Sequence, residues 1–365
     1  MLTKLKRHVP FWLRSLLRPV KRIYTASATV LRYYLAYSRY SRTGIVPDAA
    51  TNLLTPAYVL TNGRLPEFMA RRLERQLPPV EVDETKGVLP VLPHAELQAA
   101  LTNLRRDGIH VFDFRIDLDV CDQLLNFALR TPCTPFGDST PRDCPPIAFD
   151  PGNPTAPTYW FDPQLLAEHE AVQRILADPT MLRLAQAYLR MEPILNIHTM
   201  WWSVAYRKSP DYSSAQMFHM DLDRAKFLKF FIYLTDVGSE NGPHVYIRGT
   251  HRRKPRALVR DDRIPDDIVF ANCPTQQVVT LTGPRGTIFA EDTRGLHKGQ
   301  PVVSGARLVL ELEYASDRFG RAEPLIDMNG GFTDAFRAWK ERHPRLMCRF
   351  STDKSKSNTS DLRII

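Results

Sequence analysis

The 365-residue sequence is poor in cysteine and contains no long apolar run. Its five cysteines lie far apart and form no C-x-x-C pair, so neither a disulfide framework nor a zinc ribbon is indicated, and a reducing compartment fits best. No stretch approaches the roughly 20 apolar residues that a transmembrane helix needs. With 43% hydrophobic and 24% charged residues, the chain can bury one large core or two smaller ones.

Acidic residues are absent from the first 47 positions, which carry ten Lys or Arg. Of the 49 basic and 40 acidic residues of the chain, 39 basic ones and all the acidic ones lie beyond this arm. The net charge of +9 therefore belongs to the arm. The rest of the chain, residues 48–365, is nearly neutral, which disfavours nucleic acid as a partner.

Apolar residues recur at helical spacing within the basic arm, residues 1–47. They are Trp12, Leu13, Leu16, Leu17 and Val20, then Val30, Leu31, Tyr34 and Leu35. We expect Pro10 and Pro19 to break the arm into short pieces. Three interpretations stay open: an interfacial helix that contacts a membrane through residues 1–44, a helical arm packed on the domain, or an Arg-rich peptide for organelle targeting. The first two predict a cytoplasmic protein, either peripheral on a membrane surface or free of it.

Composition divides the rest of the chain into three parts. Residues 48–93 are expected to be a proline-containing linker region, in which 77–93 shows no regular pattern. Residues 94–345 are expected to form the main domain, and residues 346–365 a polar C-terminal tail.

The main domain begins with helical patterns and continues with strand patterns. Helices are expected at 94–107, 119–130, 163–177, 180–190 and 331–343, with a first strand at 109–114 and a long loop over 131–157. Seven or more short strands follow between 193 and 316. This order predicts a mainly β, α+β fold, an antiparallel sandwich or barrel braced by helices on one face.

The hexapeptide FHMDLD, residues 218–223, places ionisable groups at alternate positions of an expected strand. His219, Asp221 and Asp223 would then project from one face, with Met220 and Leu222 on the other. Taken alone, the hexapeptide fits a metal corner, and it also fits a strand-edge histidine flanked by solvated aspartates.

Further along the chain, His297 ends a loop and Arg307 begins a strongly patterned strand. Two histidines and one carboxylate that leave open positions on a metal suit a non-haem Fe(II) that must also bind oxygen. Arg307 shares a strand face with Glu311. The Arg307 guanidinium could enter the metal cavity, where a dicarboxylate co-substrate would neutralise its charge. Alternatively, Arg307 could form an ion pair with Glu311, and His297 would then lie at the surface.

These motifs resemble the phytanoyl-CoA dioxygenase (PhyH) family of Fe(II)- and 2-oxoglutarate-dependent oxygenases. The resemblance covers about residues 94–318 and includes H-x-D at 219–221, the segment FFIYLTDVGSENGPHVYIRGTHR, and His297 with an arginine ten residues later. It implies a double-stranded β-helix, a jelly-roll or cupin-like core. It also implies iron on His219, Asp221 and His297, and the carboxylate of 2-oxoglutarate on Arg307.

The resemblance also implies further contacts and cofactors. Phe231 and Tyr233 would line the co-substrate pocket, and Ser304 would compensate for Gly299, which stands where some relatives carry a small polar residue. The implied cofactors are Fe(II), 2-oxoglutarate and O2, with ascorbate as a stimulating reductant. Asp223 is expected to support the metal site or contact substrate.

Because Asp221 occupies the position that halogenating relatives replace with a small residue, the resemblance favours hydroxylation of a small-molecule or lipid-type substrate. Desaturation or ring closure, an inactive jelly-roll binding module and a zinc or other cupin-like metalloenzyme remain alternatives. Three more histidines are interpreted as structural: His198, His244 and His251. Four aromatic residues could line an extended pocket or pack in the core: Trp160, Trp201, Trp202 and Tyr206.

Overall fold

The alternating pattern near the end of the sequence forms β10 (Ala306–Ala315), a central strand of a seven-stranded sheet. Leu308, Leu310 and Leu312 are buried among helices on one face of this sheet. Val309 belongs to a separate apolar cluster on the other face. Because successive side chains of a strand point to opposite faces, this one strand contributes to two cores.

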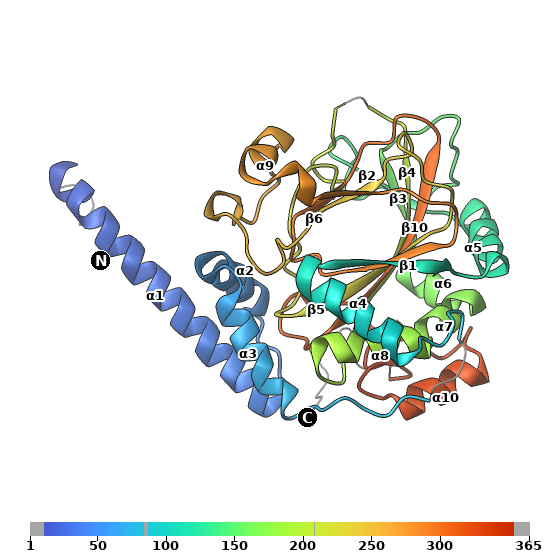
Figure 1. Ribbon diagram of the computed structural model, residues 1–365, viewed down its shortest axis with the longest axis horizontal. Helices are drawn as coiled ribbons and strands as arrows, with labels where there is room; N and C mark the ends of the chain where they lie inside the picture. Colours follow the sequence, from blue (N-terminus) through green and yellow to red (C-terminus); the bar gives the residue numbers. More distant parts are fainter. Residues whose placement is uncertain (1–10, 84–86, 208, 354–365) are drawn as a thin grey trace.

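The computed structural model describes residues 11–83, 87–207 and 209–353, with side chains from residue 24 onward (Figure 1). The α-helices are α1 (Phe11–Thr43), α2 (Ala50–Thr61), α3 (Arg64–Glu74), α4 (His94–Asp107), α5 (Leu118–Arg130), α6 (Pro163–Glu168), α7 (Glu170–Leu176), α8 (Pro179–Leu189), α9 (Asp266–Asn272) and α10 (Asp334–Arg342). The remaining strands are β1 (Ile109–Arg115), β2 (Thr134–Phe136), β3 (Thr158–Trp160), β4 (Ile194–Val204), β5 (Phe227–Tyr233), β6 (His244–Ile247), β7 (Val278–Leu281), β8 (Thr287–Glu291), β9 (His297–Gly299), β11 (Ile326–Asp327) and β12 (Phe350–Ser351).

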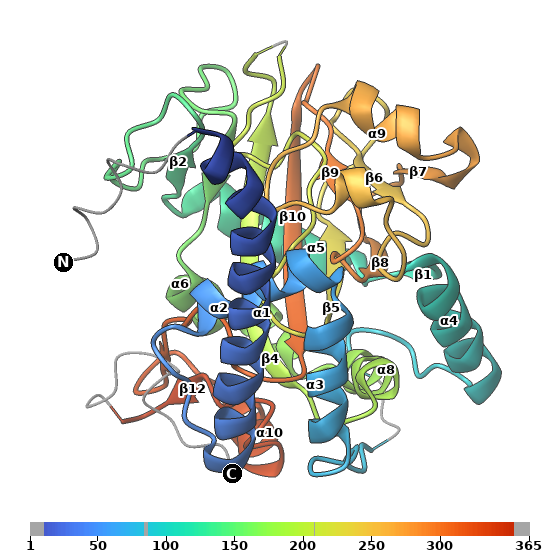
Figure 2. The ribbon, with the colours of Figure 1, turned by 90° about the vertical axis from the view of Figure 1, so that its left-hand side faces the viewer.

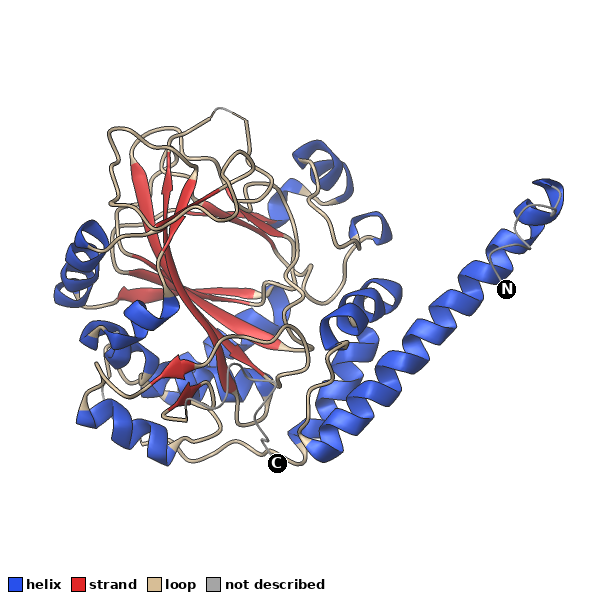
Figure 3. Ribbon diagram, turned by 180° about the vertical axis from the view of Figure 1, so that it is seen from behind, coloured by secondary structure: helices blue, strands red, loops and turns tan. Residues whose placement is uncertain are grey.

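The strands of the domain alternate between two facing sheets (Figure 3). The larger sheet has the order β1-β8-β5-β10-β4-β3-β2, and the smaller sheet has the order β7-β6-β9. Every pair in both sheets is antiparallel. Along the chain, β4 and β5 lie in the larger sheet, β6 and β7 in the smaller, β8 in the larger, β9 in the smaller and β10 in the larger. This alternation is that of a double-stranded β-helix, so the predicted jelly-roll fold class is confirmed, with two separate sheets rather than a closed barrel.

Helices brace the outer face of the larger sheet, as predicted. Three of them begin at aspartates whose side chains accept backbone N–H bonds: Asp117 before α5, Asp162 before α6 and Asp178 before α8. The single helix expected over 163–177 is wrong. The backbone of His169 is extended, which ends α6 and starts α7.

Two helices correct the predicted linker at 48–93. In α2 and α3, apolar side chains at helical spacing are buried in the main core, among them Leu54, Met69 and Leu73. Proline signals misled the prediction, because Pro66 lies in the first turn of α3, where its missing N–H costs nothing. Among the described residues of 77–93 no helix or strand occurs, as expected.

Residues 11–43 of the basic arm form one helix, α1, which continues through position 19, so the expected break at Pro19 is wrong. The expected break at Pro10 lies outside the described residues. Proline removes one bond of the helical ladder but leaves the turns on either side able to form. The second half of α1 packs on the domain, because Tyr33, Tyr37 and Tyr40 are buried around Phe319. α2 and α3 lie between α1 and the sheets (Figures 1 and 2).

The domain also extends beyond its predicted end at residue 345. Leu346, Met347 and Phe350 belong to the main core, and β12 pairs with β11. The polar segment predicted as a loose tail falls mostly in 354–365, outside the described residues. Within the described part of the chain, no helix combines the length and the apolar character that crossing a bilayer requires.

Candidate active site

Residues 218–223 run beside the smaller sheet but do not form the regular strand that we predicted. Phe218 and His219 make only isolated bridges, to Ile264 and His297. The backbones of His219 and His297 exchange two hydrogen bonds of 3.0 Å, and the Asp221 N–H donates to the carbonyl of Thr293 at 2.8 Å. These contacts hold the H-x-D motif beside β9, although the two segments are far apart in sequence.

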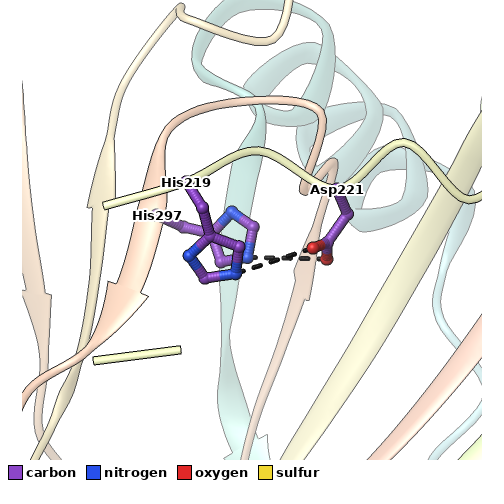
Figure 4. Close-up of side chains that lie close together, drawn as sticks. All are labelled: His219, Asp221 and His297. Atoms are coloured by element: carbon purple, nitrogen blue, oxygen red, sulfur yellow. Dashed lines mark ion pairs between the residues drawn. The ribbon is translucent and has the colours of Figure 1, made fainter. Parts of the chain in front are cut away.

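This backbone pairing brings the three predicted metal ligands together (Figure 4). One ligand atom from each of His219, Asp221 and His297 lies within 4.8 Å of the others. Asp221 Oδ1 is 3.6 Å from His219 Nε2, and Asp221 Oδ2 is 3.5 Å from His297 Nε2. Both histidines are buried, so a surface position for His297 is excluded.

The histidine tautomers suit metal binding. His219 Nδ1 lies 2.9 Å from the carbonyl oxygen of Met217, and His297 Nδ1 lies 3.0 Å from that of Gly295. Because a carbonyl oxygen can only accept, each Nδ1 must carry the proton and donate it. When the ring is neutral, its Nε2 then carries the lone pair and faces Asp221, which is the tautomer that a metal ligand needs.

Lys229 of β5 is a residue of the site that the sequence analysis missed. Its Nζ lies 2.8 Å from Asp221, 3.0 Å from Glu311, 3.2 Å from Asp223 and 3.6 Å from Glu313. The signal was a lysine inside the apolar run FLKFFIY, where a buried ammonium needs carboxylate partners. Asp223 contacts Lys229 rather than joining the triad, and its expected role in supporting the metal site or contacting substrate stays a prediction.

The charges around the triad favour an ionised Asp221. Burial would raise the pKa of its carboxyl group, but Lys229 and His297 outweigh burial and hold that pKa well below its usual range. Burial lowers the pKa of His219 well below its ordinary value. Burial also acts to lower the pKa of His297, yet the nearby Asp221 leaves it raised. The site thus presents an ionised carboxylate between two histidine side chains, and a divalent cation that binds there would displace any proton on His297 Nε2.

Arg307 points into the same cavity as the triad and is buried. Its guanidinium donates to the carbonyl of Gly242 and, at 3.2 Å, to Ser203 Oγ, while Nε has no hydrogen-bond partner. Among the described residues no carboxylate forms an ion pair with it, and the alternative pairing with Glu311 is wrong because Glu311 pairs with Lys229. A buried cation without a counter-ion is costly, so this position is suited to an anionic ligand.

The other predicted co-substrate contacts are only partly brought to the site. Phe231 lines the cavity, and Tyr233 packs next to it, donating to the carbonyl of Leu281 at 3.0 Å. Ser304 does not reach the cavity, because it lies exposed on the turn before β10. Ser203 supplies the nearby hydroxyl instead. A β-carbon on Gly299 would lie 3.1 Å from Arg307 Nη2, so this glycine leaves room for the guanidinium.

The cavity has a volume of about 500 Å³ and continues beyond the triad between polar and aromatic walls. Trp160 and Trp201 line it and stack on each other, with ring centroids 4.8 Å apart. Arg263 and Arg321 also line it. Trp202 is instead buried in the core against Phe149, so the aromatic residues divide between the two predicted alternatives.

Of the three histidines interpreted as structural, two line this cavity. His198 Nε2 lies 2.9 Å from the carbonyl of Pro163, and His244 pairs with the buried Glu291 at 3.0 Å. Their partners are protein groups, which agrees with structural roles. His251 lies elsewhere, next to Arg294 and Lys226.

In a comparison with known proteins, a family model matches the part of the chain that contains this site. Residues 159–308 match the family model described as phytanoyl-CoA dioxygenase (PhyH). These residues, less than half of the chain, are similar to the phytanoyl-CoA dioxygenase family. The PhyH match contains all three triad residues and Arg307, and it spans β3 to the start of β10. No curated protein matches the chain.

Several solved structures match the chain at low identity. The epimerase SnoN from nogalamycin biosynthesis is 18% identical, with 67% of this chain and 89% of that chain covered and a TM-score of 0.45. EctD from S. alaskensis is 19% identical, with 68% and 86% covered and a TM-score of 0.42. HygX from Streptomyces hygroscopicus is 15% identical, with 66% and 93% covered and a TM-score of 0.41.

Proposed function

We propose that this protein is a non-haem Fe(II)- and 2-oxoglutarate-dependent oxygenase that hydroxylates a small-molecule or lipid-type substrate. The observation that carries the proposal is the convergence of two histidines and one carboxylate within 4.8 Å, in a cavity that also holds a buried arginine without a carboxylate partner among the described residues. The match to the PhyH family model supports it. A purely structural histidine cluster would not explain the buried Arg307 in the same cavity.

The residues present fit both implied groups. Nε2 of His219, Nε2 of His297 and the carboxylate of Asp221 would hold Fe(II) and leave positions open for a co-substrate and O2. Arg307 would hold the distal carboxylate of 2-oxoglutarate through its guanidinium, and Phe231 would pack against the methylene groups. When bound, the metal and co-substrate would supply oxidation of a C–H bond coupled to decarboxylation of 2-oxoglutarate to succinate.

The protein's own groups prepare the site. Lys229 donates to Asp221 Oδ2 at 2.8 Å, which orients the carboxylate. The backbone carbonyls of Met217 and Gly295 fix the two imidazole rings. Buried walls on β5, β8 and β10 exclude water around Arg307. Trp160, Trp201 and the charged residues beyond the triad would position a substrate that carries polar groups.

Anaerobic titration of the protein with Fe(II) and 2-oxoglutarate tests the proposal. We expect the weak visible charge-transfer band of the chelate in the wild type and its loss in His219→Ala. His198→Ala is the matched control, because His198 lines the same cavity but lies outside the triad. Absence of the band in a wild-type protein that binds neither metal nor 2-oxoglutarate would support the binding-module alternative. Succinate release would then identify candidate substrates that are accepted. The product formed from such a substrate would distinguish hydroxylation from desaturation or ring closure.

A further inference from the structure

The outer face of α1 remains uncovered although the opposite face is docked. Tyr33, Tyr37 and Tyr40 point into the domain and are buried. On the other side of the helix, Leu31 and Leu35 are 56% and 57% exposed, and Tyr24 is 75% exposed. Figure 1 shows no other described element on this outer side. Helix α1 is therefore apolar on two faces, of which the domain uses one.

The uncovered residues form a stripe along the helix. Tyr24, Leu31 and Leu35 are spaced by seven and four residues, which places them on one face. In the sequence, Leu13, Leu17 and Val20 are spaced by four and three residues, which is also a spacing typical of one helical face. From Tyr24 to Leu35 the stripe extends over about 17 Å at 1.5 Å per residue, so it is long enough to lie along a surface.

Basic residues flank the stripe. Arg32, Arg39 and Arg42 of α1 are exposed, and the chain has no acidic residue before Asp48. Beside Leu35, a groove of about 600 Å³ between α1 and α3 is lined by Arg42, Arg72 and Arg75 and by no acidic residue. An apolar stripe bordered by cations matches a layer of lipid tails beneath anionic headgroups.

We infer that the α1 face, defined as Tyr24, Leu31 and Leu35 with Arg42, Arg72 and Arg75, binds the surface of an anionic membrane. The alternative is that a second copy of this chain binds the stripe. It is disfavoured because two such faces would bring arginines against arginines with no acidic residue to pair them. The described helices do not cross a bilayer, so attachment is peripheral.

Cosedimentation with vesicles tests this inference, using phosphatidylcholine alone and phosphatidylcholine with phosphatidylserine. We expect binding to the anionic vesicles only, weakened by added NaCl because cations supply part of the attraction. The double variant Leu31→Glu with Leu35→Glu should weaken binding by more than about tenfold, since it puts charge where acyl chains would lie. The charge-matched control is Leu118→Glu with Leu129→Glu, two exposed leucines of α5, and it should bind like the wild type.

Three outcomes would overturn the inference. They are no binding of the wild type to anionic vesicles, equal binding of the two double variants, or a homodimer in sedimentation velocity that only the α1 variant dissolves. Unchanged thermal unfolding of the α1 variant would show that it folds, which we expect because both leucines are more than half exposed. The assay needs no metal or 2-oxoglutarate, so its result is independent of the proposed enzymatic function.

Discussion

At the scale of single residues, Arg307 carries the co-substrate prediction. Changing Arg307 to Ala should raise the KM for 2-oxoglutarate by more than about tenfold, because a buried charge-assisted pair is lost. Iron binding should persist, because the triad does not contact the guanidinium. Arg307→Lys should recover only part of the affinity, since an ammonium lacks the planar fork. Steady-state kinetics with varied 2-oxoglutarate measures this, and an unchanged KM in Arg307→Ala would contradict the assignment.

At the scale of elements, Lys254 joins α2 to the loop that precedes β9. Its Nζ donates to the carbonyls of Arg294 and Thr250, at 2.6 and 2.7 Å, and to the hydroxyl of Tyr58 at 3.2 Å. Burial lowers the pKa of Lys254 to about 7, an effect that Asp292 opposes and Arg294 strengthens. This buried amine therefore links the N-terminal helices to the loop that ends at His297.

The lowered pKa predicts a pH dependence of stability. Between pH 7 and the ordinary lysine value of 10.5, Lys254 holds up to one more proton in the unfolded chain than in the folded protein, so its contribution to the free energy of unfolding rises with pH. Relative to Lys254→Met, the wild type should gain up to about 2 kcal/mol from pH 7 to pH 9. Urea unfolding of both proteins at the two pH values measures it. A difference that stays constant or shrinks with pH would refute the assignment.

At the scale of the whole molecule, the N-terminal helices are part of the domain. Tyr37 donates to Asp317 at 2.9 Å, and the hydroxyl of Tyr40 accepts from the backbone of Arg318 at 3.0 Å. Deleting residues 1–44 would uncover Phe319 and leave the buried Asp317 without this donor. We expect the deletion to lower the free energy of unfolding by several kcal/mol, about the cost of removing buried aromatic side chains.

A shorter deletion is the control for this prediction. Removing residues 1–23 leaves Tyr33, Tyr37 and Tyr40 in place and should leave the free energy of unfolding unchanged. Denaturant unfolding of the two truncated proteins compares them directly. Equal stability of both would show that the docking of α1 contributes nothing to the fold. Because the longer deletion is expected to destabilise the fold, the point variants of the α1 face are a cleaner test of membrane binding.

The sequence by itself determined the features that depend on local periodicity and on fixed spacing. Alternation in β10 predicted which side chains face the helices, and H-x-D with His297 and Arg307 predicted the residues that the structure gathers in one cavity. It misjudged the linker at 48–93, the break at Pro19 and the position of Ser304. In the linker, local proline signals were outweighed by the packing of α2 and α3 against residues far along the chain.

Only the tertiary structure decided the contacts between distant segments. Lys229 meets four carboxylates that come from β10 and from the H-x-D segment, and no local pattern encodes this meeting. The same holds for the two faces of α1, because the periodicity of a helix shows where apolar stripes run but not which stripe the domain covers. Periodicity is a property of the backbone, whereas burial depends on the position of every other element.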